Sequence, residues 1–158
     1  MQATQSKVPG GPTFVGQRLE RLEDAALLTG RGSYADDLGV KPGTLYAAVL
    51  RSPHAHARLR SMEINAALQL PGVRAVLTGE DIQRWAQPFV VGIKQPMQHW
   101  ALAVDCVRYV GEPVAVVVAE DRYTAEDALD LIQVAYEPRR AVMEIDAALA
   151  EGCELLHE

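Results

Sequence analysis

The sequence feature that most constrains the fold is a run of six apolar, mostly β-branched residues at positions 114–119 (VAVVVA). β-Branched side chains favour strands. Because the run does not alternate with polar residues, both faces of the predicted strand are expected to be buried. Such a strand needs partners on both sides, so the chain is predicted to fold around a sheet. Six residues are too few to cross a membrane.

The hydrophobic period changes twice after this run. Asp121 is predicted to cap a helix that presents apolar residues at three- and four-residue spacing. These residues are Ala125, Ala128, Leu129 and Ile132. From Ile132 onward the apolar residues alternate with polar ones, which predicts a strand that ends at Pro138.

The rest of the chain predicts short elements separated by Gly and Pro. Strands are predicted over 45–50, 56–61 and 73–77. Short helices are predicted over 23–28, over 66–70 behind a cap at Asn65, after Thr78, and over about 144–149. Residues 85–100 show no period and contain two prolines, which predicts a long loop. Strands and helices mix without a regular βαβ rhythm, so the predicted fold class is α+β, with mixed sheets and short helices.

Composition narrows the function classes. The 158 residues carry 15 basic and 21 acidic side chains, a formal net charge of −6. An acidic chain lacks the positive field that nucleic-acid binding needs. Cys106 and Cys153 form neither a CxxC pair nor a disulfide framework, which favours a reduced, cytoplasmic setting. The N-terminus has no secretory h-region. Residues 1–13 are polar and rich in Gly and Pro, so we expect a flexible arm before a single domain over 14–158.

The most distinctive string is RSPHAHAR at residues 51–58. His54 and His56 are two residues apart, so on a strand they would point the same way and could share one metal ion. A third ligand is needed, and His99 and His157 are distant in sequence. Two histidines that hydrogen-bond to backbone at a strand entry are the simpler interpretation. Pro53 places a kink or a strand start here.

Other motifs favour structural roles. Gly30 and Gly32 form a lone GxG without the partners of a phosphate loop. Gly30 is better explained as a left-handed helix cap, and Asp36 with Asp37 as a turn. Gly111, Glu112 and Pro113 precede the apolar run. They form either a tight turn or a cleft with Glu112 as an acid or base, and the turn is favoured. The residues alone therefore assign no catalytic, cofactor-binding or metal-binding role.

Four ordered segments resemble a known family. They are VGQRLERLEDAALLTGRGSYADD (15–37), LYAAVLRSPHAHARL (45–59), LPGVRAVLTGEDI (70–82) and VRYVGEPVAVVVAEDRYTAEDAL with VAYEP (107–138). Together they resemble the N-terminal a/b hammerhead domain of the xanthine dehydrogenase and aldehyde oxidase family. The opening motif is most similar to the carbon monoxide dehydrogenase large-subunit branch. The chain departs from the family pattern at Arg139 and Arg140, where a Leu-Pro pair usually follows YEP; both arginines are expected to face solvent.

The resemblance implies an oxidoreductase. Members of this family hydroxylate carbon centres or oxidise carbon monoxide with water as the oxygen source. They use a molybdenum–pterin cofactor, with iron–sulfur clusters and FAD on partner subunits or domains. The cofactor ligands and substrate residues lie C-terminal to the hammerhead domain, so the resemblance implies no catalytic residue and no cofactor in this chain. It implies a truncated or split large subunit whose hammerhead segment covers the molybdenum-binding domains and makes subunit contacts.

The candidate contact residues come from the two strings above. They are Arg51, His54, His56, Arg58, Gly111, Glu112 and Pro113. Two alternatives remain open. The first is a free-standing binding or scaffold module that reuses the fold. The second is a small metalloenzyme built on His54 and His56.

Overall fold

The computed structural model describes residues 15–16, 21–92 and 97–157. It divides the chain into two compact units, Met1–Lys41 and Pro42–Glu158. The predicted flexible arm over 1–13 lies outside the described residues. The predicted single domain over 14–158 stays a prediction.

The described part of the first unit holds two short helical segments, α1 (Asp24–Leu28) and the 3₁₀ helix η1 (Ala35–Leu38). Gly30 adopts φ +67°, the left-handed conformation predicted for the residue that ends α1. Asp36 and Asp37 lie in η1, where the Asp37 carboxylate accepts a hydrogen bond from the Tyr34 backbone N–H at 2.8 Å. Asp36 and Asp37 therefore lie in a tight turn, as the sequence predicts, and Asp37 stabilises it.

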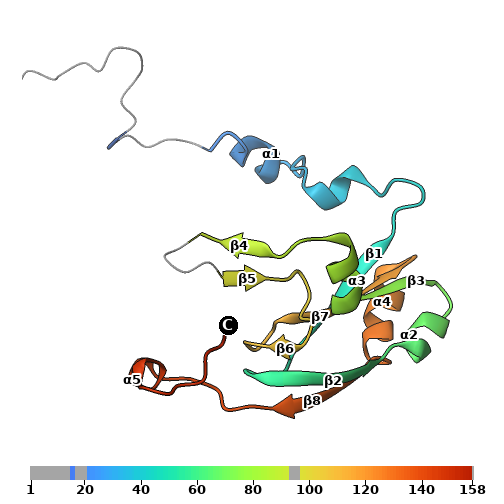
Figure 1. Ribbon diagram of the computed structural model, residues 1–158. Coiled ribbons are helices and arrows are strands. Elements are labelled where there is room, and N and C mark those ends of the chain that lie inside the picture. Colours follow the sequence, from blue (N-terminus) through green and yellow to red (C-terminus); the bar gives the residue numbers. More distant parts are fainter. Residues whose placement is uncertain (1–14, 17–20, 93–96, 158) are drawn as a thin grey trace, which may run out of the picture. The chain divides into compact units, whose positions relative to one another are not determined.

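The described residues of the second unit form three small antiparallel sheets (Figure 1). The first has the order β1 (Tyr46–Arg51), β7 (Pro113–Ala119), β3 (Val73–Thr78). The second has the order β6 (Cys106–Val107), β2 (Ala57–Glu63), β8 (Gln133–Pro138). The third pairs β4 (Phe89–Val91) with β5 (Met97–His99). This arrangement confirms the α+β class.

In residues 42–92 and 97–157, four helices accompany these sheets: α2 (Asn65–Gln69), α3 (Gly79–Trp85), α4 (Arg122–Leu129) and α5 (Ile145–Leu149). Among the described helices, none has the length and apolar character that a bilayer crossing requires. The cap of α2 is Ile64 rather than the predicted Asn65, which is the first helical residue. The cap of α3 is Thr78, as predicted; its backbone N–H and hydroxyl both donate to the Asp81 carboxylate, at 2.9 and 3.1 Å.

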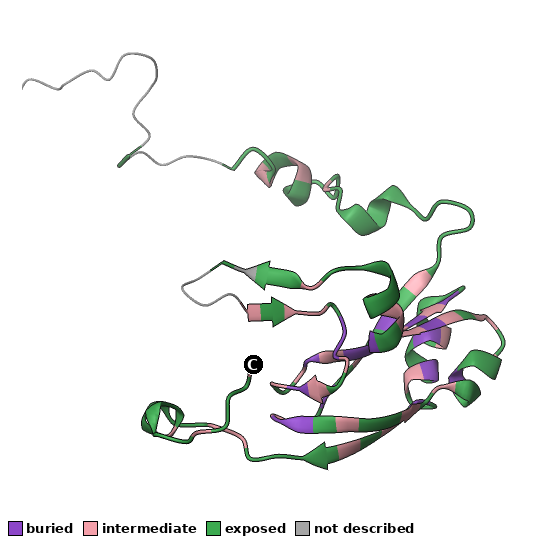
Figure 2. Cartoon of the chain, in the orientation of Figure 1, coloured by how far each residue is buried: buried purple, intermediate pink, exposed green. Residues whose placement is uncertain are grey.

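The apolar run forms the central strand β7, as predicted. The two faces of this strand pack into two separate hydrophobic cores. Ala115, Val117 and Ala119 pack beneath α2 and α4. Val114 faces the second core, with Ala57, Ala103 and Val107. Figure 2 shows the buried residues concentrated around β7 and the facing side of α4. Alanines Ala125 and Ala128 of α4 are 1% and 0% exposed, and their small side chains let the helix lie close to the sheet.

The predicted loop over 85–100 is wrong in part. Residues 89–91 and 97–99 pair as an antiparallel ladder, with Phe89 opposite His99. Strands of three residues are too short to show a period that stands out from loop sequence, and their pairing with each other supplies the order. The two-residue strand β6 has no sequence signal for the same reason. Strand β2 begins at Ala57, one residue later than predicted, so His54 and His56 lie in the bend before it.

The cap of α4 gives a testable pH dependence. Asp121 accepts from the Thr124 backbone N–H at 2.9 Å and from the Thr124 hydroxyl at 2.5 Å. These hydrogen bonds favour the ionised carboxylate and hold the pKa of Asp121 below its ordinary value of 3.8. The unfolded chain therefore binds this proton more readily, so the cap stabilises the fold above pH 3.8 and loses its effect as the pH falls further.

Asp121→Asn tests this dependence, because asparagine keeps an acceptor oxygen but does not titrate. We expect the wild-type chain to melt a few degrees above D121N at neutral pH. In acid the two melting temperatures should converge. A difference in melting temperature that stays constant from pH 7 to about pH 2 would contradict the role of the ionised Asp121 as the cap of α4.

Candidate functional site

The two strings predicted as contact candidates lie side by side at one end of β1 and β7. The Ser52 N–H donates to the Glu112 carbonyl at 2.9 Å, and the Gly111 N–H donates to the Ser52 carbonyl at 2.8 Å. Arg51 Nη1 donates to the Gly111 carbonyl at 2.9 Å. The cause is the register of the sheet, in which Arg51 is opposite Pro113 after a bulge. We call residues 51–58 and 108–113 together the paired segments.

Ser52, which the sequence analysis did not single out, fixes the bend in the first paired segment. It is 2% exposed, and its hydroxyl donates to the His54 carbonyl at 3.1 Å while accepting from the His54 N–H at 3.0 Å. The Ser52 side chain is also hydrogen-bonded to the Tyr136 hydroxyl on β8. Burial raises the pKa of the Tyr136 phenol. The Ser-Pro pair was the available signal, because serine beside proline favours turns.

The two histidines have separate partners. The His54 ring contacts the Tyr136 ring, with centroids 4.8 Å apart and planes tilted by 56°. His56 is 5% exposed, and its Nδ1 lies 3.0 Å from the Arg140 carbonyl. A carbonyl only accepts, so Nδ1 carries the proton. Within the described residues, no group of three or more His, Cys, Asp or Glu side chains could hold a metal ion.

Glu112 holds the turn together in the second paired segment. Its carboxylate accepts a hydrogen bond from the Arg108 backbone N–H, and its own N–H donates to the Tyr109 carbonyl at 3.2 Å. Gly111 adopts φ +88°, which a side chain would strain. The turn leaves Tyr109 and Val110 exposed at its tip. The Glu112 carboxylate is thereby engaged by the backbone N–H of Arg108, four residues earlier in the same turn, which is the arrangement of a structural turn.

A cavity of about 530 Å³ adjoins the paired segments. His56 and Arg58 line it, together with Cys106, Arg108 and His157. Burial raises the pKa of the Cys106 thiol, which favours the protonated form over a nucleophilic thiolate. Burial, and then the charge of Arg108, lower the pKa of His157, so this imidazole is held neutral.

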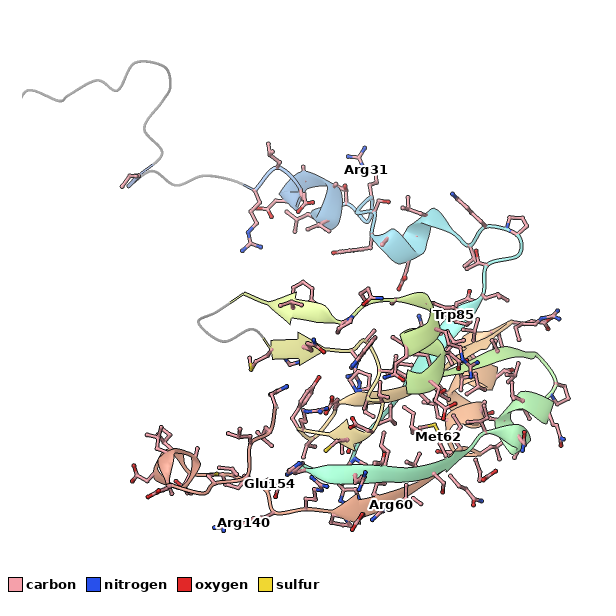
Figure 3. All side chains as sticks on the ribbon, viewed as in Figure 1. Arg31, Arg60, Met62, Trp85, Arg140 and Glu154 are labelled. Carbon is pink, nitrogen blue, oxygen red and sulfur yellow. The ribbon has the colours of Figure 1, made fainter. Side chains whose placement is uncertain are left out.

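The two arginines that depart from the family pattern are both exposed, as predicted. Figure 3 shows Arg140 pointing away from the sheet at the end of β8. Arg139 Nη1 donates to Glu154 Oε1 at 2.9 Å, which ties β8 to the C-terminal segment. Its backbone N–H also donates to the His56 carbonyl, at 2.9 Å.

Comparison with known proteins identifies the fold. Residues 29–140 match the family described as "Aldehyde oxidase and xanthine dehydrogenase, a/b hammerhead domain". The chain belongs to this family. This confirms both the resemblance seen in the sequence and the hammerhead fold.

Individual relatives are similar over most of the chain. The nicotine 6-hydroxylase large subunit of Paenarthrobacter nicotinovorans is 44% identical over 81% of this hammerhead chain and 17% of its own length. The carbon monoxide dehydrogenase large chain of Afipia carboxidovorans is 38% identical over 91% of this chain and 18% of its own. The crystal structure of quinoline 2-oxidoreductase from Pseudomonas putida 86 matches with a TM-score of 0.78 and 46% identity, over 90% of this chain and 18% of that one. The chain thus spans less than a fifth of the length of these relatives.

Proposed function

We propose that this hammerhead chain is a structural segment of the large, molybdenum-bearing subunit of an oxidoreductase. The observation that carries the proposal is its similarity, over four-fifths or more of its length, to proteins named as large subunits or chains. One further relative, from Escherichia coli O157:H7, is named as a molybdenum-binding subunit. We propose that the complete subunit oxidises a carbon centre or carbon monoxide with water as the oxygen source.

We propose that this hammerhead segment does not hold the redox centres itself. Three of its candidate residues already have partners: Glu112 accepts from a backbone N–H, His56 Nδ1 bonds a carbonyl, and the His54 ring contacts the Tyr136 ring. In the part of the chain that the structure describes, His, Cys, Asp and Glu side chains nowhere gather in threes around a possible metal position. We therefore derive no catalytic step here, and propose that the molybdenum–pterin cofactor belongs to domains beyond this fold, with iron–sulfur clusters and FAD on cytoplasmic partner subunits.

We assign the paired segments a contact role. The turn at 108–111 exposes 49% of Tyr109 and 64% of Val110, and the turn is rigidly held by Glu112 and Arg51. A rigid apolar tip loses little conformational entropy when it is covered, which favours its use in an interface. The proposed partners of this surface are the molybdenum-binding domains and the iron–sulfur and FAD subunits.

The proposal is tested by capturing the tagged chain from its native cells and measuring molybdenum and iron in the captured material. We expect both metals, together with iron–sulfur and FAD subunits, whereas the chain expressed alone carries neither metal and has no dehydrogenase activity. Recovery of an unrelated partner without molybdenum would favour a scaffold module. Molybdenum bound to the isolated chain would contradict the structural role.

The contact role has a sharper test in Val110→Glu. A buried carboxylate in the interface should reduce the recovery of partner subunits about tenfold. Val90→Glu is the matched control, since Val90 is 51% exposed on β4, outside the paired segments. Both variants should melt like the wild-type chain. Equal recovery of partner subunits with the two variants would show that the tip formed by Tyr109 and Val110 is not part of the interface.

A further inference from the structure

Positive charge gathers in the cavity beside β2 and β6, although the chain as a whole is acidic. Arg58, Arg108 and Arg139 all line this cavity of about 530 Å³. Among the described residues that line the cavity, Asp105 contributes the one carboxylate. Three guanidinium charges against the Asp105 carboxylate give these four described side chains a formal charge of +2, in a chain whose net charge is −6.

The chain's own groups use only part of these guanidiniums. Arg108 Nε donates to the Leu156 carbonyl at 2.8 Å and Nη1 to the Cys106 carbonyl at 3.0 Å, while Asp105 Oδ1 is 3.9 Å from Nη2. A guanidinium has five N–H donors, so Arg108 keeps further donors after holding the C-terminal segment in place. Arg139 is paired with Glu154, which does not line the cavity.

Of the three arginines that line the cavity, Arg58 is the one whose guanidinium is available to a ligand. It lies on β2 between Glu137 of β8 and Cys106 of β6 in the strand register. Across residues 15–16, 21–92 and 97–157, no hydrogen bond or ion pair engages its guanidinium, whereas Arg60 on the same strand pairs with Glu137 (Figure 3). Three guanidiniums around one cavity repel each other, and a bound anion would relieve that repulsion.

We propose that this cavity is a binding site for a small oxyanion, either a carboxylate or a phosphate. Arg58 provides the principal guanidinium, and Arg108 and Arg139 add charge. The planar fork of a guanidinium matches the paired oxygens of both groups, and such charge-assisted hydrogen bonds are the strong ones. Gln83 and Gln98 line the same cavity and offer amide donors, while Trp100 offers an apolar wall. The volume lies within the roughly 300–1,000 Å³ typical of small-molecule sites.

The cavity shares Arg58 and Arg108 with the paired segments, so partner domains bound to those segments would border it. Anion binding is a property of this chain's own residues, and it is tested on the 158-residue chain. Inorganic phosphate and acetate are titrated separately at low ionic strength, with isothermal calorimetry and NMR of the Trp100 indole as readouts. We expect saturable binding at one site that weakens as NaCl is added. Arg58→Gln should weaken it at least tenfold, and Arg58→Lys by less, since lysine keeps the charge but loses the fork.

Arg74→Gln is the control, because it makes the same charge change on β3, where Arg74 pairs with Glu120. It should alter the affinity by less than twofold. Tighter binding of phosphate would assign a phosphorylated ligand, and tighter binding of acetate a carboxylate; either supports the site. Absence of saturable binding by both anions to the folded chain would overturn it, as would equal losses in R58Q and R74Q.

Discussion

Replacing Gly79 with alanine is expected to lower the free energy of unfolding by about 3 kcal/mol, at the upper end of the cost of overpacking. Gly79 is the first residue of α3 and is buried. A Cβ atom built there would lie 2.3 Å from the Ala103 carbonyl oxygen and 2.8 Å from the Val104 Cα. Both are backbone atoms, so no side-chain rotation can remove the clash. Residues 103–104 or the start of α3 must move instead.

Urea denaturation of the variant measures this loss, and Gly92→Ala is the matched control. No described atom lies within 4 Å of a Cβ at Gly92, and its φ is not in the left-handed region. G92A should therefore change the unfolding free energy by less than about 0.5 kcal/mol. Similar unfolding free energies for G79A and G92A would show that the backbone of residues 103–104 moves away from α3 at little cost in free energy. That result would contradict the close packing of α3 against these residues.

Val117→Ala is expected to cost about 2–3 kcal/mol of unfolding free energy. Val117 is fully buried at the centre of β7, beneath α4. The substitution removes two methyl groups from the core and leaves a cavity that its neighbours fill only in part. The neighbours in register are Ala48 and Val76, small side chains on paired strands that have little freedom to close the space.

Val49→Ala on the adjacent strand β1 provides the comparison, because it makes the same chemical change at a side chain that is 36% exposed. It should cost less than about 1 kcal/mol. Parallel urea titrations give both values. If the two variants were destabilised equally, the core could not be centred on β7 and α4.

The sequence predicted the elements whose signals are local and strong. Four of the six residues at 114–119 are β-branched valines, Asp121 caps α4 with its side chain, and Thr78 begins α3 in a capping box with Asp81. The pairing of β1 with β7 and of β2 with β8 joins residues far apart in the chain, so no local pattern contains it. Strands β4 and β5 were missed because each gains its order from the other rather than from its own residues.

The candidate site was predicted as two separate strings, and the structure brings them together. The sequence could not show that Ser52 would bond across to Glu112, since register depends on the bulge after Leu50. The metal hypothesis required His54 and His56 on one face of a strand, whereas both lie in a bend with different partners. The simpler interpretation, a hydrogen bond to backbone at a strand entry, holds for His56, whose Nδ1 bonds the Arg140 carbonyl. The sequence analysis named Arg58 as a contact candidate and Arg139 as a solvent-facing departure from the family pattern. It did not group them with Arg108, because the three arginines have no common spacing.

The position of β7 has a consequence for how this polypeptide forms. Its partners β1 and β3 precede it in the chain, at residues 46–51 and 73–78, and do not pair with each other. During synthesis, these two strands emerge from the ribosome with unsatisfied edges, and the sheet can close only after residue 119 has left the exit tunnel. Strands of this kind are prone to association with other chains. The nascent protein should therefore depend on chaperone protection over this interval, and variants that delay closure should be lost to aggregation during translation.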